Sequence, residues 1–405
     1  MLLEKLLHIG AKIRRLRPFD MELKTTELGA YGPNGSFRVL GTMSGTSMDA
    51  LDVVEAEFTC AKGRWRGSIE VLHEVPLDEA WPERFSALAS AGAAEWFECE
   101  RDWSRWCATQ IARCTDPQKF DVIAFSGQTI FHQPANGYTA QLGSGAELYA
   151  AFGARVPVVS DLRSLDVALG GQGAPLVPVA DALLFSEYAA CLNLGGFSNI
   201  SLERNGRRLA WDVGPCNLVL NALAGRVGMP FDASGQLAAS GRVLPELFAD
   251  WMNLAYHNQP APKSLGVEWL QRSFWQVLNK HEHNGTLVTE DLLATAVAYI
   301  AAQVRLAVDG RKTLVTGGGA FNDELVRRFG EASRIGEGDV PFEAIVPDAT
   351  LVQGKEAFAF GFLGLLRWLE WDNVWPEVTG SSMAHMGGAL WGKNGLSSPS
   401  PNAMQ

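Results

Sequence analysis

Residues 40–52 read Leu40-Gly41-Thr42-Met43-Ser44-Gly45-Thr46-Ser47-Met48-Asp49-Ala50-Leu51-Asp52, and this stretch decides the fold. Strand-forming residues flank it, with Val39 before it and Val53 after it. Glycine lets backbone N–H groups approach a phosphate, hydroxyl side chains add donors, and a carboxylate can hold a metal ion. The pattern therefore predicts a β-hairpin that binds nucleotide phosphates, although an ordinary Gly/Ser turn between two strands would have a similar composition.

A second strand–glycine–strand segment lies in the middle of the chain. It reads Leu192-Asn193-Leu194-Gly195-Gly196-Phe197-Ser198-Asn199-Ile200-Ser201, again with hydroxyl and amide groups after two glycines. The repetition predicts two similar domains, each of which contributes one phosphate clamp to the same nucleotide.

A third glycine run, Gly317-Gly318-Gly319, follows a strand-like segment and would let a purine or a ribose lie flat against the backbone. It is not a Rossmann fingerprint, because Asn322 occupies the third glycine position. A Walker A loop is also absent, since Lys355 is followed by Glu356 rather than by Ser or Thr. The chain must therefore bind phosphate by another route.

Strand and helix patterns alternate along most of the sequence, which favours an α/β fold. Short apolar runs end at polar, glycine-containing segments, and ligands bind at that edge of open α/β sheets. These runs are residues 121–125, 156–160, 189–194, 209–213 and 313–316.

The length of 405 residues exceeds that of one ordinary core, so two domains are expected. We expect them over residues 37–160 and 161–392, with a flexible arm over 1–36 and a disordered tail over 393–405. A helix is expected over 356–371, and part of the segment 356–392 is a candidate to pack back onto the first domain.

Charge and composition exclude some partners. The formal net charge is -11, so no basic surplus exists to neutralise the phosphates of nucleic acid or of a membrane surface. No segment reaches the roughly 18 consecutive apolar residues that a membrane span requires. Six cysteines without CxxC spacing indicate reduced thiols in a cytoplasmic protein and no zinc site.

Motifs spread over residues 38–392 resemble those of the anhydro-N-acetylmuramic acid kinase family. The most specific is the run Ala168-Leu169-Gly170-Gly171-Gln172-Gly173-Ala174-Pro175-Leu176-Val177-Pro178. Further motifs follow the family's order at 41–49, 126–129, 212–217, 262–264, 315–319, 355–357 and 378–380.

The resemblance implies an actin-like, hexokinase-like ATPase fold, with two ribonuclease-H-like domains and ATP in the cleft between them. It also implies a cytoplasmic enzyme of cell-wall recycling that uses ATP and Mg²⁺. Such an enzyme opens the 1,6-anhydro ring of its sugar with water and phosphorylates O6. A small-molecule sugar is then the expected partner, and a homodimer is a family-level expectation.

Residue roles follow from the same resemblance. ATP would be held by residues of the three glycine segments, namely Gly45, Thr46, Ser47, Met48, Asp49, Ala50, Leu51, Asp52, Asn193, Gly195, Gly196, Gly317, Gly318 and Gly319. Asp49 and Asp212 would hold Mg²⁺, mainly through water. Gln128, Arg163 and Glu356 would contact the sugar, although Glu356 also fits a solvated glutamate in the first turn of a helix.

One carboxylate close to the attacking water suffices as general base. Asp161 ends a predicted strand and aligns with the family's catalytic aspartate, so it is the predicted base; a helix N-cap is its structural alternative. Asp166 is the competing candidate, and it could instead orient Arg163 or cap the following turn.

The chain departs from the family pattern on the sugar side. Family members usually carry Ser-His-Gly-Gln-Thr, where this chain has Phe125-Ser126-Gly127-Gln128-Thr129 and lacks the histidine. An arginine of the family is also missing within Lys263-Ser264-Leu265-Gly266-Val267-Glu268. Two alternatives therefore stay open: a kinase for another 1,6-anhydro sugar such as levoglucosan, and a non-catalytic actin-like nucleotide-binding protein.

Overall fold

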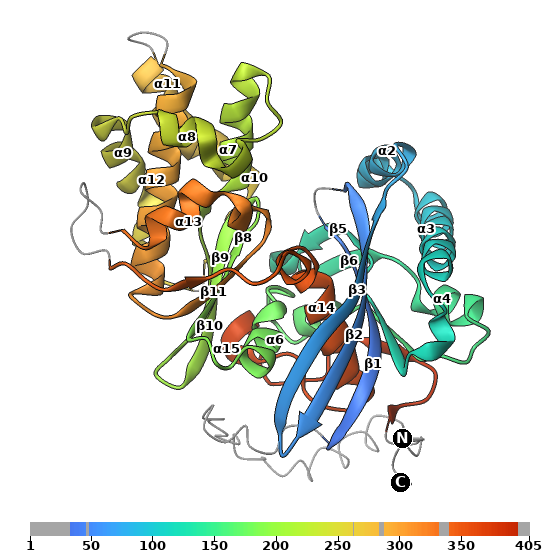
Figure 1. Ribbon diagram of the computed structural model, residues 1–405. Coiled ribbons are helices and arrows are strands. Elements are labelled where there is room, and N and C mark those ends of the chain that lie inside the picture. The colour runs from blue at the N-terminus through green and yellow to red at the C-terminus, as the bar shows by residue number, and fades with distance from the viewer. Residues whose placement is uncertain (1–32, 46–47, 262, 283–286, 332–339, 396–405) are drawn as a thin grey trace, which may run out of the picture.

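The computed structural model describes residues 33–45, 48–261, 263–282, 287–331 and 340–395. Thr46 and Ser47 of the predicted phosphate hairpin lie outside the described residues, as do most of the predicted arm and tail. The fold is α/β, as the sequence predicts, and its two main sheets occupy separate lobes (Figure 1).

The first lobe is built on a six-stranded sheet in the order β13-β7-β4-β1-β2-β3. Its strands are β1 (Gly35–Ser44), β2 (Ala50–Ala61), β3 (Arg64–Pro76), β4 (Val122–Phe125), β7 (Val158–Ser160) and β13 (Ala389–Trp391). β1 and β2 pair antiparallel with Ser44 opposite Leu51, so the predicted hairpin around the first glycine segment is confirmed. β4 runs parallel to both β1 and β7, which brings three strand ends to the same edge.

Both faces of this sheet are covered. Leu40 and Ile123 pack with Trp103 under the helices α2 (Ala80–Ala87), α3 (Ala93–Cys114) and α4 (Gly145–Ala151). The alternate residues Val39 and Val122 face the opposite way, into a second core. This alternation is the period of two that a strand imposes on its side chains. A small antiparallel sheet of β5 (Gln128–Gln133) and β6 (Tyr138–Leu142) extends the lobe.

The second lobe contains a five-stranded sheet in the order β10-β9-β8-β11-β12. Its strands are β8 (Ala190–Leu194), β9 (Phe197–Arg204), β10 (Arg207–Pro215), β11 (Thr313–Thr316) and β12 (Ala344–Ile345). The helices of this lobe are α7 (Asn217–Ala224), α8 (Gln236–Ser240), α9 (Pro245–Met252), α10 (Val267–Trp269), α11 (Trp275–Glu282), α12 (Thr289–Val308) and α13 (Asp323–Phe329). The second predicted hairpin is confirmed, because β8 and β9 pair antiparallel around Gly195 and Gly196.

Helix α12 is the one helix of the described chain that is long and apolar enough to cross a bilayer by length and composition. Within the protein, however, 83% of that apolar window is buried. It packs against α7, α8, α9 and α13 and forms the centre of the second lobe's core.

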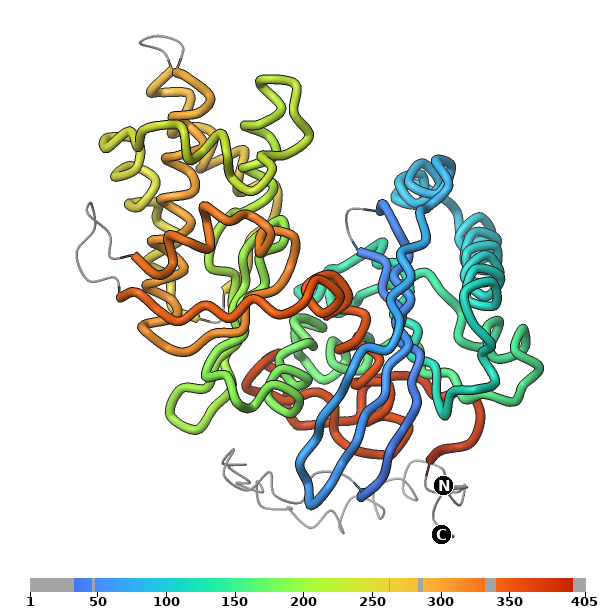
Figure 2. The backbone as a smooth tube through the Cα atoms, viewed as in Figure 1, coloured from blue at the N-terminus to red at the C-terminus, as the bar shows by residue number. Residues whose placement is uncertain are grey.

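Two helices lie between the lobes, α6 (Val177–Leu184) and α14 (Ala349–Trp368) (Figure 1). Figure 2 follows the backbone from the second lobe into α14, which packs on β1, β2 and β4 of the first sheet. The close approach depends on Gly41 and Gly361, since a Cβ at Gly41 would meet the Gly361 backbone at 3.0 Å. The helix predicted over 356–371 begins two turns earlier than expected, at Ala349. Asp348 caps this helix, because its side chain accepts the Leu351 N–H at 2.9 Å.

After α14 the chain touches both lobes. The short helix α15 (Pro376–Thr379) packs against β10 of the second lobe, and β13 then pairs antiparallel with β7. The last described strand therefore completes the sheet with which the described chain begins.

Candidate active site

The turn after β1 carries the first glycine segment. Met48 has a left-handed backbone with φ of 54°, and its N–H donates to the Gly45 carbonyl at 3.2 Å. Asp49 is exposed, and its carboxylate accepts the N–H of Ala50 at 3.0 Å. Asp49 thus lies on the solvent side immediately before β2.

Leu51 differs from its neighbours in this segment. Its side chain is 1% exposed and packs in the core with Trp103. Strand alternation turns the Leu51 side chain into the sheet's covered face, so only its backbone could face a nucleotide, and the assignment of Leu51 to ATP stays a prediction.

Gln128, the first residue of β5, forms hydrogen bonds with the end of β1 and with Gly45. Its side chain is fully buried, its Oε1 accepts the Ser44 hydroxyl at 2.6 Å, and its Nε2 donates to the Gly45 carbonyl at 3.5 Å. Gln128 therefore fixes the end of β1, and its contact with a sugar stays a prediction.

The two candidate bases differ in accessibility. Asp161 follows β7 with a left-handed backbone, φ of 52°, and is half-buried. Its Oδ1 accepts the Ser164 N–H at 3.2 Å, which is the capping contact considered as its structural alternative. A non-glycine residue held in this conformation costs free energy, and such residues cluster at functional sites.

Asp166, by contrast, is completely buried. Its carboxylate accepts the Gly173 N–H and the Thr379 hydroxyl, each at 2.6 Å. Asp166 thus ties the run 168–178 to the end of α15, and of the two carboxylates only Asp161 reaches solvent.

Arg163, after β7, and Glu356, on α14, influence each other through their charges. Arg163 donates to the Gly173 carbonyl at 2.8 Å and lies over the Phe360 ring at 5.4 Å. Glu356 is exposed, yet surrounding protein desolvates it and raises its pKa, while Arg163 and Lys355 act in the opposite direction.

The acidic residues of the hairpin belong to the same region. The pKa of Asp52 is raised to about 7, first by burial and then by the negative charges of Glu74, Asp49 and Glu356. Asp52 and Glu356, and Glu356 and Arg163, thus influence each other's charge, and α14 packs against β1, β2 and β7, the strands that carry or precede these residues.

The other two glycine segments meet in the second lobe. A Cβ at Gly317, where φ is 80°, would collide with Asn193 Oδ1 and the Leu194 backbone, and a Cβ at Gly319 would lie 2.7 Å from the Leu194 side chain. Asn217, at the start of α7, donates to the Leu194 carbonyl at 2.9 Å. The runs after β8 and β11 thus form one glycine-lined surface with Asn217, a residue that the sequence predictions missed.

Helix α14 connects the two groups of residues. In its first turn the Val352 carbonyl accepts the Gly317 N–H at 3.2 Å, and one turn later Glu356 lies near Arg163. The glycine-lined surface of the second lobe and the polar site of the first are therefore joined by one rigid element.

Asp212 on β10 is held by its neighbours. Its Oδ2 accepts the Leu265 N–H at 2.8 Å, its carbonyl accepts the Tyr256 hydroxyl at 2.7 Å, and burial raises the pKa of its carboxyl. Across the described ranges no three His, Cys, Asp or Glu side chains converge on a metal position. The assignment of Asp49 and Asp212 to Mg²⁺ stays a prediction, and an ion held by them would take its other ligands from water and from nucleotide phosphates.

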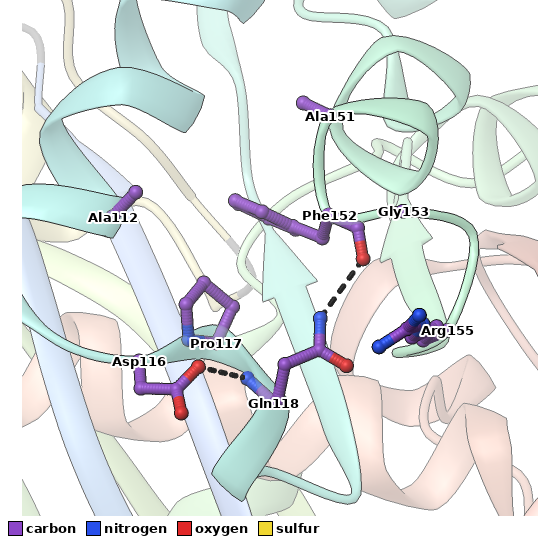
Figure 3. Close-up of a pocket in the computed structure, with 8 residues that line it drawn as sticks. All are labelled: Ala112, Asp116, Pro117, Gln118, Ala151, Phe152, Gly153 and Arg155. Atoms are coloured by element: carbon purple, nitrogen blue, oxygen red, sulfur yellow. Dashed lines mark hydrogen bonds between the residues drawn. The ribbon is translucent and has the colours of Figure 1, made fainter.

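A pocket of about 310 Å³ lies elsewhere, on the outside of the first lobe (Figure 3). It is lined at the ends of α3 and α4 by Ala112, Asp116, Pro117, Gln118, Ala151, Phe152, Gly153 and Arg155. None of these is a predicted site residue, so this pocket is separate from the candidate active site.

Known proteins resemble this chain over nearly its whole length. A protein named anhydro-N-acetylmuramic acid kinase from Methylobacterium nodulans is 35% identical over 388 residues, covering 87% of this chain and 98% of that protein. Its namesake from Paramagnetospirillum magneticum is 34% identical over 366 residues, covering 86% and 98%.

Among solved structures, component A of (R)-2-hydroxyglutaryl-CoA dehydratase from Acidaminococcus fermentans is 11% identical with a TM-score of 0.41, covering 81% of this chain and 97% of that one. A family model described as anhydro-N-acetylmuramic acid kinase matches residues 37–393. On the family match and the two sequence relatives, the chain belongs to the anhydro-N-acetylmuramic acid kinase family.

Proposed function

We propose that this chain opens the 1,6-anhydro ring of anhydro-N-acetylmuramic acid with water and phosphorylates O6 with ATP, giving N-acetylmuramic acid 6-phosphate and ADP. The observation that supports the proposal is the place of α14 beside the first sheet. Asp161 and Arg163 directly follow β7, which packs against α14, and Glu356 of α14 interacts with Arg163 and with Asp52 of the hairpin. Family membership makes the chain a sugar kinase and implies the use of ATP.

The reaction balances without a further reactant. Water forms a bond to the anomeric carbon, the bond from that carbon to O6 breaks, and O6 takes the γ-phosphoryl group as its bond to ADP breaks. One proton of the water must leave during the attack. Asp161, the accessible carboxylate at the end of β7, would accept it as general base, which contributes about 10²- to 10⁴-fold in rate.

Positioning is the other requirement of phosphoryl transfer. We assign the nucleotide phosphates to the turn at Gly45–Asp52 and to Gly195 and Gly196, and the adenosine to Gly317–Gly319. Asp49 and Asp212 would hold Mg²⁺ through water, and the ion would neutralise charge on the phosphates. Arg163 and Glu356 would bind and orient the sugar.

A second candidate substrate is another 1,6-anhydro sugar, such as levoglucosan. Ser126 stands where the family usually has a histidine, and its hydroxyl donates to the adjacent Gly127 carbonyl at 3.1 Å. This position therefore carries a short side chain, hydrogen-bonded to the next residue's carbonyl, in place of an imidazole that could reach an N-acetyl or lactyl group.

The deciding experiment is coupled ADP release from purified protein with Mg-ATP and each sugar, with Asp161→Asn as the control. Turnover on the amino sugar that the substitution abolishes is the expected result. Turnover on levoglucosan alone would transfer the mechanism to the second substrate. With no Asp161-dependent ADP release on either sugar, the catalytic proposal fails, and a nucleotide-binding protein without sugar chemistry replaces it.

A further inference from the structure

A buried polar cluster lies between the two lobes. Its members are Asp181 of α6, Ser201 of β9, Arg208 of β10 and Lys355 of α14, and we call it the interlobe cluster. Lys355 Nζ lies 2.8 Å from Asp181 Oδ1. The Ser201 hydroxyl donates to Asp181 Oδ2 at 2.5 Å, and Arg208 donates to the Ser201 oxygen at 2.7 Å. All four residues are at most 6% exposed.

Stability alone does not account for this cluster. Apolar residues surround it, among them Phe185, Cys191 and Leu314 of the core that joins the lobes. Replacing a buried ion pair by well-packed apolar residues is often neutral or stabilising, because taking charges out of water is costly. What buried charges do provide is direction, since the Lys355–Asp181 contact fixes where the Lys355 ammonium group lies.

The direction matters because Lys355 is followed by Glu356. Consecutive residues of an α-helix point about 100° apart around its axis. Lys355 points toward α6 and the second sheet, whereas Glu356 is exposed and interacts with Arg163 and Asp52. The Lys355–Asp181 contact acts together with the packing of α14 on β1, β2 and β4 to fix the rotation of α14 about its own axis, and that rotation sets where the Glu356 carboxylate lies.

We propose that Lys355, through its ion pair with Asp181 in the interlobe cluster, is the positioning residue for the Glu356 carboxylate. Lys355 is buried and acts on the sugar only through Glu356. The kinetic part of this inference rests on the proposed function, whereas its structural part concerns the Glu356 carboxylate itself.

The pKa of Glu356 can be measured, and it responds to the charge of Lys355. The groups that act on Glu356 are Arg163 after β7, Asp52 on β2 and Lys355 on α14, with Asp49 and Glu74 acting on Asp52 in turn. Burial raises the pKa of Glu356, and the positive charge of Lys355 opposes that rise. Loss of this charge must therefore move the Glu356 titration, and any acid limb that depends on it, to higher pH.

The test compares Lys355→Met with Lys355→Arg in the full chain. The Glu side-chain carboxyl carbons are titrated by ¹³C NMR, with Glu356 assigned from Glu356→Gln, and turnover is followed against pH. Lys355→Met should shift the Glu356 titration upward and lower kcat on the sugar at least tenfold, with little change in the KM for ATP. Lys355→Arg should restore both.

A matched control is Lys119→Met, because Lys119 makes an ion pair of the same length, 2.8 Å, with Glu55 of β2. That variant should leave the Glu356 titration where it is in the wild type. A Lys355→Met protein with the wild-type Glu356 titration and turnover would overturn the inference.

A variant with the three charges replaced together, Asp181→Leu, Arg208→Met and Lys355→Met, covers the case in which the single substitution prevents folding. It should melt close to the wild type and still show the upward shift. A stable triple variant with an unshifted titration would also overturn the inference. If wild-type protein turns over neither sugar, the proposed function fails by itself, and the NMR titration still decides the role of Lys355.

Discussion

At the scale of single residues, two aspartates five positions apart have opposite roles. Asp161 has a solvent-accessible carboxylate and a left-handed backbone, whereas both carboxylate oxygens of the buried Asp166 accept hydrogen bonds, from Gly173 and Thr379. Substituting each by asparagine should therefore separate chemistry from stability.

Asp166→Asn should destabilise the protein by about 1–3 kcal/mol, because one buried donor loses its acceptor. Urea unfolding measures this cost. Asp161→Asn should leave the unfolding midpoint nearly unchanged while it removes turnover. Equal loss of stability in both variants would contradict the division of roles.

The pH dependence of stability offers a second test at this scale. The pKa of Asp52 is about 7 in the folded protein, whereas its ordinary value, which applies to the unfolded chain, is 3.8. Between these two pH values the folded state therefore keeps a proton on Asp52 that the unfolded state has released. Stability must then fall as pH rises through this window. Asp52→Asn should raise the free energy of unfolding more at pH 8 than at pH 5, measured by urea unfolding at both. The same gain at both values would show that Asp52 titrates normally.

At the scale of elements, the residue after β11 has no room for a side chain. Gly317 has φ of 80° and lies against Asn193 and Leu194, so an added Cβ meets both backbone strain and a collision. Gly317 follows β11, lies against Asn193 and Leu194 of β8, and donates its N–H to the Val352 carbonyl of α14. Three elements therefore meet at this residue. We assign the adenosine to this surface, which makes nucleotide affinity the sensitive quantity.

Gly317→Ala should weaken ATP binding at least tenfold, measured by calorimetry with a non-hydrolysable analogue. The matched control is Gly228→Ala, because Gly228 has a similar φ of 77° but no atom within 4 Å of an added Cβ. Both variants bear the backbone strain, and only Gly317→Ala bears the collision. Equal affinity in the two would remove Gly317 from the nucleotide site.

At the scale of the whole molecule, two sheets in separate lobes are joined through α6 and α14 (Figure 1). The residues assigned to phosphates lie on both lobes, in the β1–β2 turn and in the β8–β9 turn. A nucleotide held by both turns would draw the lobes together and limit wasteful hydrolysis of ATP by bulk water.

Small-angle scattering checks this expectation. The radius of gyration should decrease when Mg²⁺ and a non-hydrolysable ATP analogue are added to the wild type. Gly317→Ala should require more analogue for the same change. A radius of gyration that is unaffected at saturating nucleotide would contradict closure.

Local patterns in the sequence were enough to predict the two glycine hairpins, the α/β class, the family and the strand ends that carry Asp161 and Gly317–Gly319. Strand alternation and glycine placement can be read without knowing which residues lie opposite in the fold. Which side chains those patterns expose depends on tertiary packing. It turned Leu51 into the core, buried Gln128 and Asp166, and brought Asn217 to Leu194 and Glu356 to Arg163 and Asp52. Such pairings join residues of different elements, and those of Glu356 follow from the packing of α14 on the first sheet, which no local pattern specifies.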